Sequence, residues 1–174
     1  MMDTAAEFIV VMGVSGAGKS EIAQRLAGAL AAPFIEADRL HSAENVARMA
    51  QGIGLTDEMR WPWLAAVCAA ARAEPQRPVI IACSALRRVY RDFLRRQLGD
   101  VGFVFLDGPR ELIAERLRGR PAHFATTSLL ESQLATLEPP TGEADTFAVS
   151  LTLAPAQIVD AVLRRVQPAE APSR

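Results

Sequence analysis

The sequence has few of the residues that mark several large classes of protein. Its 174 residues include two cysteines and two histidines, and the formal net charge is −1. Cys68 and Cys83 are too few for a disulfide framework and lack the spacing of metal ligands, so we expect buried thiols in a cytoplasmic protein. A charge near zero gives no electrostatic reason to expect a nucleic acid or a membrane surface as partner.

Long apolar runs are also missing. No run approaches the ~20 residues that span a bilayer, and the first seven residues include two acidic and no basic side chains, so we expect no secretory signal. Half of the residues are nevertheless hydrophobic, which is enough for a sizeable core in one domain covering residues 1–174. Only the tail 167–174 has the composition of a flexible segment.

What the sequence does contain is a regular alternation of strand-like and helix-like segments. Short apolar runs predict five strands, and apolar residues at helical intervals fill the stretches between them. This alternation predicts an α/β fold, a three-layer sandwich with a five-stranded parallel sheet and helices on both faces, whose ligands bind at the carboxyl ends of the strands. The expected strands are 8–12, 33–36, 78–83, 102–107 and 146–153, and the expected helices include 43–51, 56–72, 84–95, 109–118, 128–137 and 155–166.

The strongest motif follows the first expected strand. Residues 13–20 read G-x-x-x-x-G-K-S and lead into a helical pattern, the strand–loop–helix context of a phosphate-binding P-loop. Glycines let backbone N–H groups approach an anion, Lys19 supplies a cation for the β- and γ-phosphates, and the Ser20 hydroxyl can bind Mg²⁺. The alternative, a simple glycine turn, would not need the complete motif. We therefore expect ATP and Mg²⁺, with nucleotide contacts from Gly13, Ser15, Gly16, Ala17, Gly18, Lys19 and Ser20.

A titratable cluster follows the second expected strand. Glu36, Asp38 and His41 fall within six residues at the edge where a ligand is expected. A carboxylate there can hold Mg²⁺, orient an acceptor hydroxyl or accept its proton, although an acidic helix cap in a solvated loop is the alternative. Asp107 resembles the aspartate that ends a Walker B strand, but Ser20 with a carboxylate of the second strand can hold the metal without it. We therefore favour Glu36 as metal ligand and Asp38 as catalytic group.

Arginines surround the two expected sites. Arg116 and Arg120 lie four residues apart on one helix face, and we predict that they act as cations of a lid at about 119–128, Arg116 on the nucleotide and Arg120 in catalysis. His123 lies in the same loop. A second basic set suits an anionic acceptor, although isolated surface arginines are the default explanation for any one member. This set comprises Arg48, Arg60, Arg87 and Arg88, while Trp61 and Trp63 are expected to pack the neighbouring helices.

Several segments together resemble the P-loop gluconokinases of bacteria. Beside the P-loop they are Ala-Asp-Arg-Leu-His at 37–41, Leu-Thr-Asp-Glu-Met-Arg-Trp-Pro-Trp-Leu at 55–64, Cys-Ser-Ala-Leu-Arg-Arg-Val-Tyr-Arg-Asp-Phe-Leu-Arg at 83–95, and His-Phe at 123–124 followed by Ser-Gln-Leu-Ala-Thr-Leu-Glu-Pro at 132–139. The resemblance runs in order from residue 9 to residue 140. The segments at 62–64 and 83–92 are far more specific than the P-loop alone.

This resemblance implies ATP-dependent phosphorylation of D-gluconate at its terminal hydroxyl, giving 6-phospho-D-gluconate. It also implies a nucleoside-monophosphate-kinase-like fold with a lid, and a homodimer. Lys19 and Ser20 would serve the phosphates and Mg²⁺, and Asp38 would act as general base or orient the hydroxyl. The resemblance places Asp38, His41, Arg48, Arg60, Arg87, His123 and Gln133 around the sugar acid.

The sequence departs from the family pattern at four places. Glu36 stands where aspartate is usual, Met59 where an acid is usual, Arg87 where lysine is usual, and Pro121-Ala122 where glycine precedes His-Phe. None of these departures removes a group that phosphoryl transfer requires. They leave open a different sugar acid as acceptor. A related kinase of the shikimate type and a nucleotide-binding switch without transfer chemistry are the remaining alternatives.

Overall fold

The computed structural model describes residues 6–119 and 127–167. Within this part of the chain, five strands alternate with seven α-helices and one short 3-10 helix, η1. The elements are β1 (Phe8–Met12), α1 (Lys19–Leu30), β2 (Phe34–Glu36), η1 (Ala37–Leu40), α2 (Ala43–Ala50), α3 (Asp57–Ala73), β3 (Val79–Ala82), α4 (Arg88–Leu98), β4 (Val101–Asp107), α5 (Arg110–Arg118), α6 (Thr127–Thr136), β5 (Thr146–Ser150) and α7 (Pro155–Val166).

The five strands form one parallel sheet in the order β2-β3-β1-β4-β5. β1 is central, and Val10 lies opposite Ile81 of β3 on one side and Phe103 of β4 on the other. All five residues of β1 are buried, as expected of a strand that is covered on both faces. The predicted α/β architecture with a five-stranded parallel sheet is confirmed.

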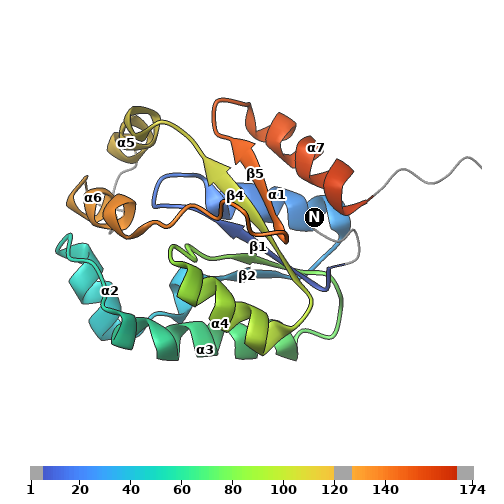
Figure 1. Ribbon diagram of the computed structural model, residues 1–174, viewed down its shortest axis with the longest axis horizontal. Helices are drawn as coiled ribbons and strands as arrows, with labels where there is room; N and C mark the ends of the chain where they lie inside the picture. Colours follow the sequence, from blue (N-terminus) through green and yellow to red (C-terminus); the bar gives the residue numbers. More distant parts are fainter. Residues whose placement is uncertain (1–5, 120–126, 168–174) are drawn as a thin grey trace, which may run out of the picture.

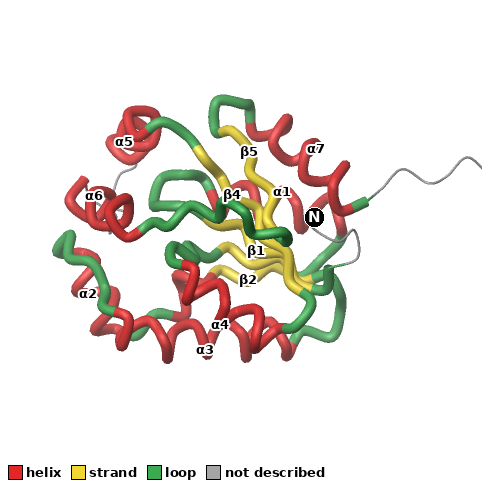
Figure 2. The backbone as a smooth tube through the Cα atoms, viewed as in Figure 1, coloured by secondary structure: helices red, strands yellow, loops and turns green. Residues whose placement is uncertain are grey.

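Helices cover both faces of the sheet (Figure 1). α1 packs against α7 and β3, whereas α3 and α4 pack together on the opposite face. The shorter helices α2, α5 and α6 gather at one end of the molecule, beyond the carboxyl ends of the strands (Figure 1). Figure 2 shows that the loop between β1 and α1 and the loop between β3 and α4 reach this same end. The fold therefore collects its loops where an α/β sheet binds ligands.

The core contains both cysteines. Cys68 is 2% exposed and Cys83 is 1% exposed, and burial raises the pKa of the two thiols to about 11 and about 12. Thiols that stay protonated at neutral pH are poor nucleophiles and poor metal ligands. The prediction that both are buried thiols is confirmed.

The helix that was predicted from residue 84 begins later. Residues 83–87 form a loop and α4 starts at Arg88, with Ala85 in the left-handed region at φ 46°. The guanidinium of Arg91 explains this later start, because its Nη1 donates hydrogen bonds to the Ala85 and Leu86 carbonyls at 2.8 and 3.2 Å. The last strand likewise ends at Ser150, although it was predicted to continue to 153. Beyond Ser150 the chain turns, and the Ser150 and Thr152 hydroxyls bond each other at 2.7 Å.

Candidate functional site

The loop between β1 and α1 is a curled phosphate cradle. Gly16 has φ 83°, and a Cβ on it would lie 2.7 Å from Leu117 Cγ, so only glycine fits where the loop packs on α5. Gly18 caps α1 at φ 89°, and Lys19 Nζ donates to the Val14 carbonyl at 2.9 Å. Backbone N–H groups and the positive end of a helix thus meet at one point, which is a ready site for phosphate.

A second hollow adjoins the outer side of this loop. Arg116 lines it, and its guanidinium donates to the Leu151 carbonyl at 3.1 Å. The lining residues are Ala17, Gly18, Glu21, Ile22, Glu115, Arg116, Gly119, Leu151, Pro155 and Ile158. The structure therefore brings Arg116 into the same hollow as Gly18 of the P-loop. Its contact with a nucleotide stays a prediction.

The side chain of Ser20, the last residue of the P-loop motif, contacts that of Glu36. The Ser20 hydroxyl donates a hydrogen bond to the Glu36 carboxylate, which joins the start of α1 to the end of β2. A hydroxyl and one carboxylate are hard oxygen ligands, and they suit Mg²⁺, which takes few protein ligands and completes its shell with phosphates and water. No cluster of three or more His, Cys, Asp or Glu residues able to hold a metal occurs in the described ranges. Asp107, at the exposed end of β4, is not the carboxylate that reaches Ser20.

A polar cavity lies on the other side of Lys19. Six of the sequence-predicted residues line it, although they come from distant parts of the chain: Ser15, Lys19, Asp38, His41, Arg60 and Gln133. The remaining lining residues are Met49, Leu55, Trp63, Ser84 and Leu129. The cavity thus joins the phosphate cradle to η1, α2, α3, the β3–α4 loop and α6.

The ring of His41 is neutral at physiological pH. It stacks on Trp63 with ring centroids 4.1 Å apart, and burial lowers its pKa to about 4, against the opposing effect of Asp38. Nδ2 of Asn45 lies 3.3 Å from Nδ1 of His41, and Trp63 Nε1 donates to the Ala37 carbonyl at 2.7 Å. His41 is therefore a positioned hydrogen-bonding group of the cavity and not a cation.

Arg60 is a buried cation in the cavity wall. The residue is 7% exposed, and its Nη1 donates to the Leu55 carbonyl at 2.6 Å and to the Tyr90 hydroxyl at 2.9 Å. No carboxylate within the described part of the chain comes within ion-pair distance of this guanidinium, although a buried charge is costly unless it is paired. The cavity therefore presents a positive group that an anionic ligand would neutralise.

Gln133 connects α6 to the phosphate cradle. The backbone N–H of Ser15 donates to Gln133 Oε1 at 2.7 Å. On the opposite side, the N–H of Gly13 donates to the Ser84 carbonyl at 3.3 Å. Both contacts hold the P-loop against the wall of the polar cavity.

Not every predicted residue faces the cavity. Arg48 donates from Nε to the Gly54 carbonyl at 2.7 Å and supports the α2–α3 loop. Arg87 pairs with Asp57 at 2.5 Å and with Glu138 at 3.2 Å, and Arg88 is largely exposed.

Arg120, His123 and the segment Pro121-Ala122 lie outside the described residues, as does most of the predicted lid.

Sequence reasoning missed part of the cavity wall. Trp63 was expected to pack between helices, and it also lines the cavity and stacks on His41. Its spacing of three from Arg60 puts both on one face of α3, a signal that could have identified it. Ser84 follows the end of a strand at the edge of the sheet where ligands bind, and this position could have identified it. Met49, Leu55 and Leu129 carry no such signal in the sequence.

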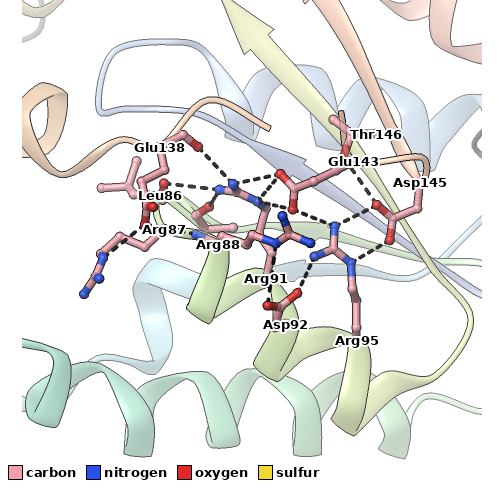
Figure 3. A network of polar contacts seen from close by, with 11 residues as sticks. Leu86, Arg87, Arg88, Arg91, Asp92, Arg95, Glu138, Glu143, Asp145 and Thr146 are labelled. Atoms are coloured by element: carbon pink, nitrogen blue, oxygen red, sulfur yellow. Dashed lines mark hydrogen bonds and ion pairs between the residues drawn. The ribbon is translucent and has the colours of Figure 1, made fainter. Parts of the chain in front are cut away.

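A buried ion pair fixes the β3–α4 loop (Figure 3). The guanidinium of Arg91 is paired with Glu143 at 2.9 Å, with the two side chains 1% and 5% exposed. The same guanidinium binds the carbonyls of Ala85, Leu86 and Glu138. Arg91 thereby joins the loop that carries Ser84 to the segment that precedes β5.

Comparisons of this chain with known proteins find relatives that agree with one another in family and fold. The family model described as an AAA domain matches residues 8–140. The thermosensitive gluconokinase of Escherichia coli K12 is 43% identical over 138 residues, which cover 78% of this chain and 74% of that protein. The gluconokinase of Arabidopsis thaliana is 40% identical over 94% of both chains. The crystal structure of a gluconokinase from Sinorhizobium meliloti 1021 is 47% identical, with a TM-score of 0.83 over 95% of this chain and 93% of that one.

Proposed function

This chain belongs to the gluconokinase family, and we propose that it transfers the γ-phosphoryl group of ATP to the terminal hydroxyl of D-gluconate, giving 6-phospho-D-gluconate. A P-loop kinase uses ATP with a divalent metal ion. We propose Mg²⁺ as that ion, because Ser20 and Glu36 offer the oxygen ligands that it prefers. When bound, the ion would reduce the negative charge of the phosphates that the transfer must bring together.

The observation that carries this proposal is the buried guanidinium of Arg60 in the wall of the polar cavity. Lys19 belongs to the phosphate cradle and His41 is neutral, so Arg60 is the cation left for an acceptor among the described lining residues. A carboxylate is the anionic part of a sugar acid and pairs well with a guanidinium. Arg60 therefore supports an acidic acceptor over a neutral one.

Asp38 supports the transfer step. Asp38 lines the same cavity as Lys19, so an acceptor hydroxyl between the two residues would lie near both a proton acceptor and the γ-phosphate. We propose that Asp38 orients that hydroxyl and takes up its proton as the oxygen attacks phosphorus. Lys19 would neutralise charge on the transferring group, and His41 and Gln133 would bind further hydroxyls of the acceptor.

The proposal also covers residues outside the polar cavity. Arg116 and Arg120 would contact the nucleotide and the transferring phosphoryl group, and His123 would contact the acceptor from the lid. Arg48 and Arg87 do not line the polar cavity, so their contact with substrate would require a movement of α2 or of the β3–α4 loop. A homodimer and a cytoplasmic location also remain proposals. No helix in the described ranges combines the length and apolarity of a membrane span.

A coupled assay with a panel of acceptors tests the proposed function. The purified protein is mixed with ATP, Mg²⁺ and either D-gluconate, shikimate or no acceptor, and ADP release is followed. We expect ADP release that depends on D-gluconate, with 6-phospho-D-gluconate as the product. Turnover with shikimate alone would support the related-kinase alternative, and nucleotide binding without any turnover would support a switch.

A further inference from the structure

Tyr90 is the side chain that links the cavity cation to a second helix. It lies on α4, is 1% exposed, and its hydroxyl accepts a hydrogen bond from Nη1 of Arg60 at 2.9 Å. The guanidinium also lies 5.1 Å from the centre of the Tyr90 ring, within the range of a cation–π contact. One edge of Arg60 is therefore fixed by Tyr90 and by the Leu55 carbonyl.

The direction of the Tyr90 hydrogen bond is set by Asp57. A phenol has one O–H to donate, and Tyr90 donates it to the Asp57 carboxylate at the start of α3. The lone pairs of the hydroxyl are then left to accept from Arg60. A charged acceptor for its proton also makes this oxygen a stronger acceptor.

Asp57 is held in its ionised form. The hydrogen bond from Tyr90 is the largest cause that lowers the pKa of this carboxyl from its ordinary value. Burial opposes it, and the hydrogen bond and charge of Arg87 lower the pKa further. Arg87 Nη1 lies 2.5 Å from Asp57, and Arg87 also pairs with Glu138. Asp57 thus stays a proton acceptor for Tyr90 throughout the neutral range.

We propose that Tyr90 and Asp57 are positioning residues for the acceptor, which orient Arg60 so that its remaining N–H groups face the carboxylate of the sugar acid. This inference rests on the proposed function. It gives Arg87 an indirect part as the partner of Asp57, outside the polar cavity. It also explains why a buried guanidinium keeps one geometry without a carboxylate bonded to it.

The substitution Tyr90→Phe removes the hydroxyl and keeps the ring. We expect the KM for D-gluconate to rise about tenfold, the effect of losing one hydrogen bond to a charged group, while kcat and the KM for ATP stay within about twofold. Asp57→Asn should raise the same KM, since its amide can no longer hold the hydroxyl proton as a carboxylate does. This second variant preserves the test if Tyr90→Phe does not fold.

Trp61→Phe is the matched control. Trp61 packs edge-on against Tyr90 with ring centroids 5.6 Å apart, and it makes no hydrogen bond to Arg60. We expect Trp61→Phe to lower the melting temperature without changing the KM for D-gluconate.

An unchanged KM in Tyr90→Phe and Asp57→Asn, in an enzyme that phosphorylates D-gluconate, would overturn the inference and leave the proposed function standing. An equal rise in Trp61→Phe would also overturn it, because packing would then explain the effect. No turnover of D-gluconate by the unmodified enzyme would overturn the proposed function and this inference together.

Discussion

The phosphate cradle is made from consecutive residues, 13–20, whereas the polar cavity beside it collects side chains from η1, α2, α3, the β3–α4 loop and α6. The cradle acts mainly through backbone N–H groups, and its shape depends on glycines and on the start of one helix. The cavity acts through side chains, and these are held by contacts between residues far apart in the chain. The half that we propose binds the nucleotide is thus a local structure, and the half that we propose binds the acceptor is a product of the tertiary fold.

Loss of the Lys19 cation from the phosphate cradle should have the largest effect, a fall in kcat/KM. Lys19→Ala removes the charge that we propose faces the β- and γ-phosphates, and we expect kcat/KM to fall about 10³-fold with both ATP and acceptor present. Steady-state kinetics and calorimetric titration with ATP measure the change. Arg25→Ala on the same helix is the control, because Arg25 is exposed and, among the residues the structure describes, pairs only with Glu21 at 3.1 Å. A residual rate above one tenth of the original would contradict a phosphate contact for Lys19.

Replacement of Arg91, which supports the cavity side of the site, should have the next largest effect, a loss of stability. Arg91→Met leaves Glu143 buried with less compensation and frees three loop carbonyls, so we expect the free energy of unfolding to fall by about 3 kcal/mol. Chemical denaturation measures it. The exposed pair of Arg25 and Glu21 should contribute less than about 0.5 kcal/mol in the same experiment. Equal losses at the two pairs would show that the buried pair has no special part in holding the β3–α4 loop.

Asp38→Asn separates chemistry from binding. The amide keeps the shape of the side chain and cannot accept a proton as a carboxylate does, so we expect kcat to fall about 10²-fold while the Kd for ATP is unchanged. Single-turnover kinetics and nucleotide titration give the two quantities. If kcat is retained, Asp38 has no catalytic part, and if ATP binding falls as strongly as kcat, Asp38 belongs to the nucleotide half.

Stability should also depend on pH through His41. The pKa of His41 is about 4 in the folded protein and near 6.5 in an unfolded chain, so the unfolded state binds more protons between these values. Stability should therefore be fully present above pH 6.5 and decline as the pH falls toward 4. Denaturation curves across this range measure the slope, and His41→Gln should reduce it. A slope unchanged by the substitution would place the effect on other groups.

The same contrast explains what the sequence could predict. β1, the P-loop and α1 are adjacent in the chain, so a motif and its flanking periodicity were enough to predict them. The start of α4 could not be predicted, since it depends on Arg91 reaching carbonyls that its own helix would otherwise use. Arg48 and Arg87 carry the same charge as Arg60, and only the tertiary contacts show that Arg60 lines the cavity whereas the other two bind carbonyls and carboxylates elsewhere.

The selectivity of the enzyme between D-gluconate and D-sorbitol shows whether Arg60 binds the carboxylate of the acceptor. D-sorbitol has a hydroxymethyl group where gluconate has its carboxylate, so the ratio of kcat/KM values isolates recognition of the acid. We predict that the unmodified enzyme prefers gluconate by about 100-fold, the effect of a charged hydrogen-bonded pair, and that Arg60→Met lowers this ratio to below about tenfold. An unchanged ratio in Arg60→Met would show that the carboxylate is bound elsewhere and that Arg60 does not recognise the acid.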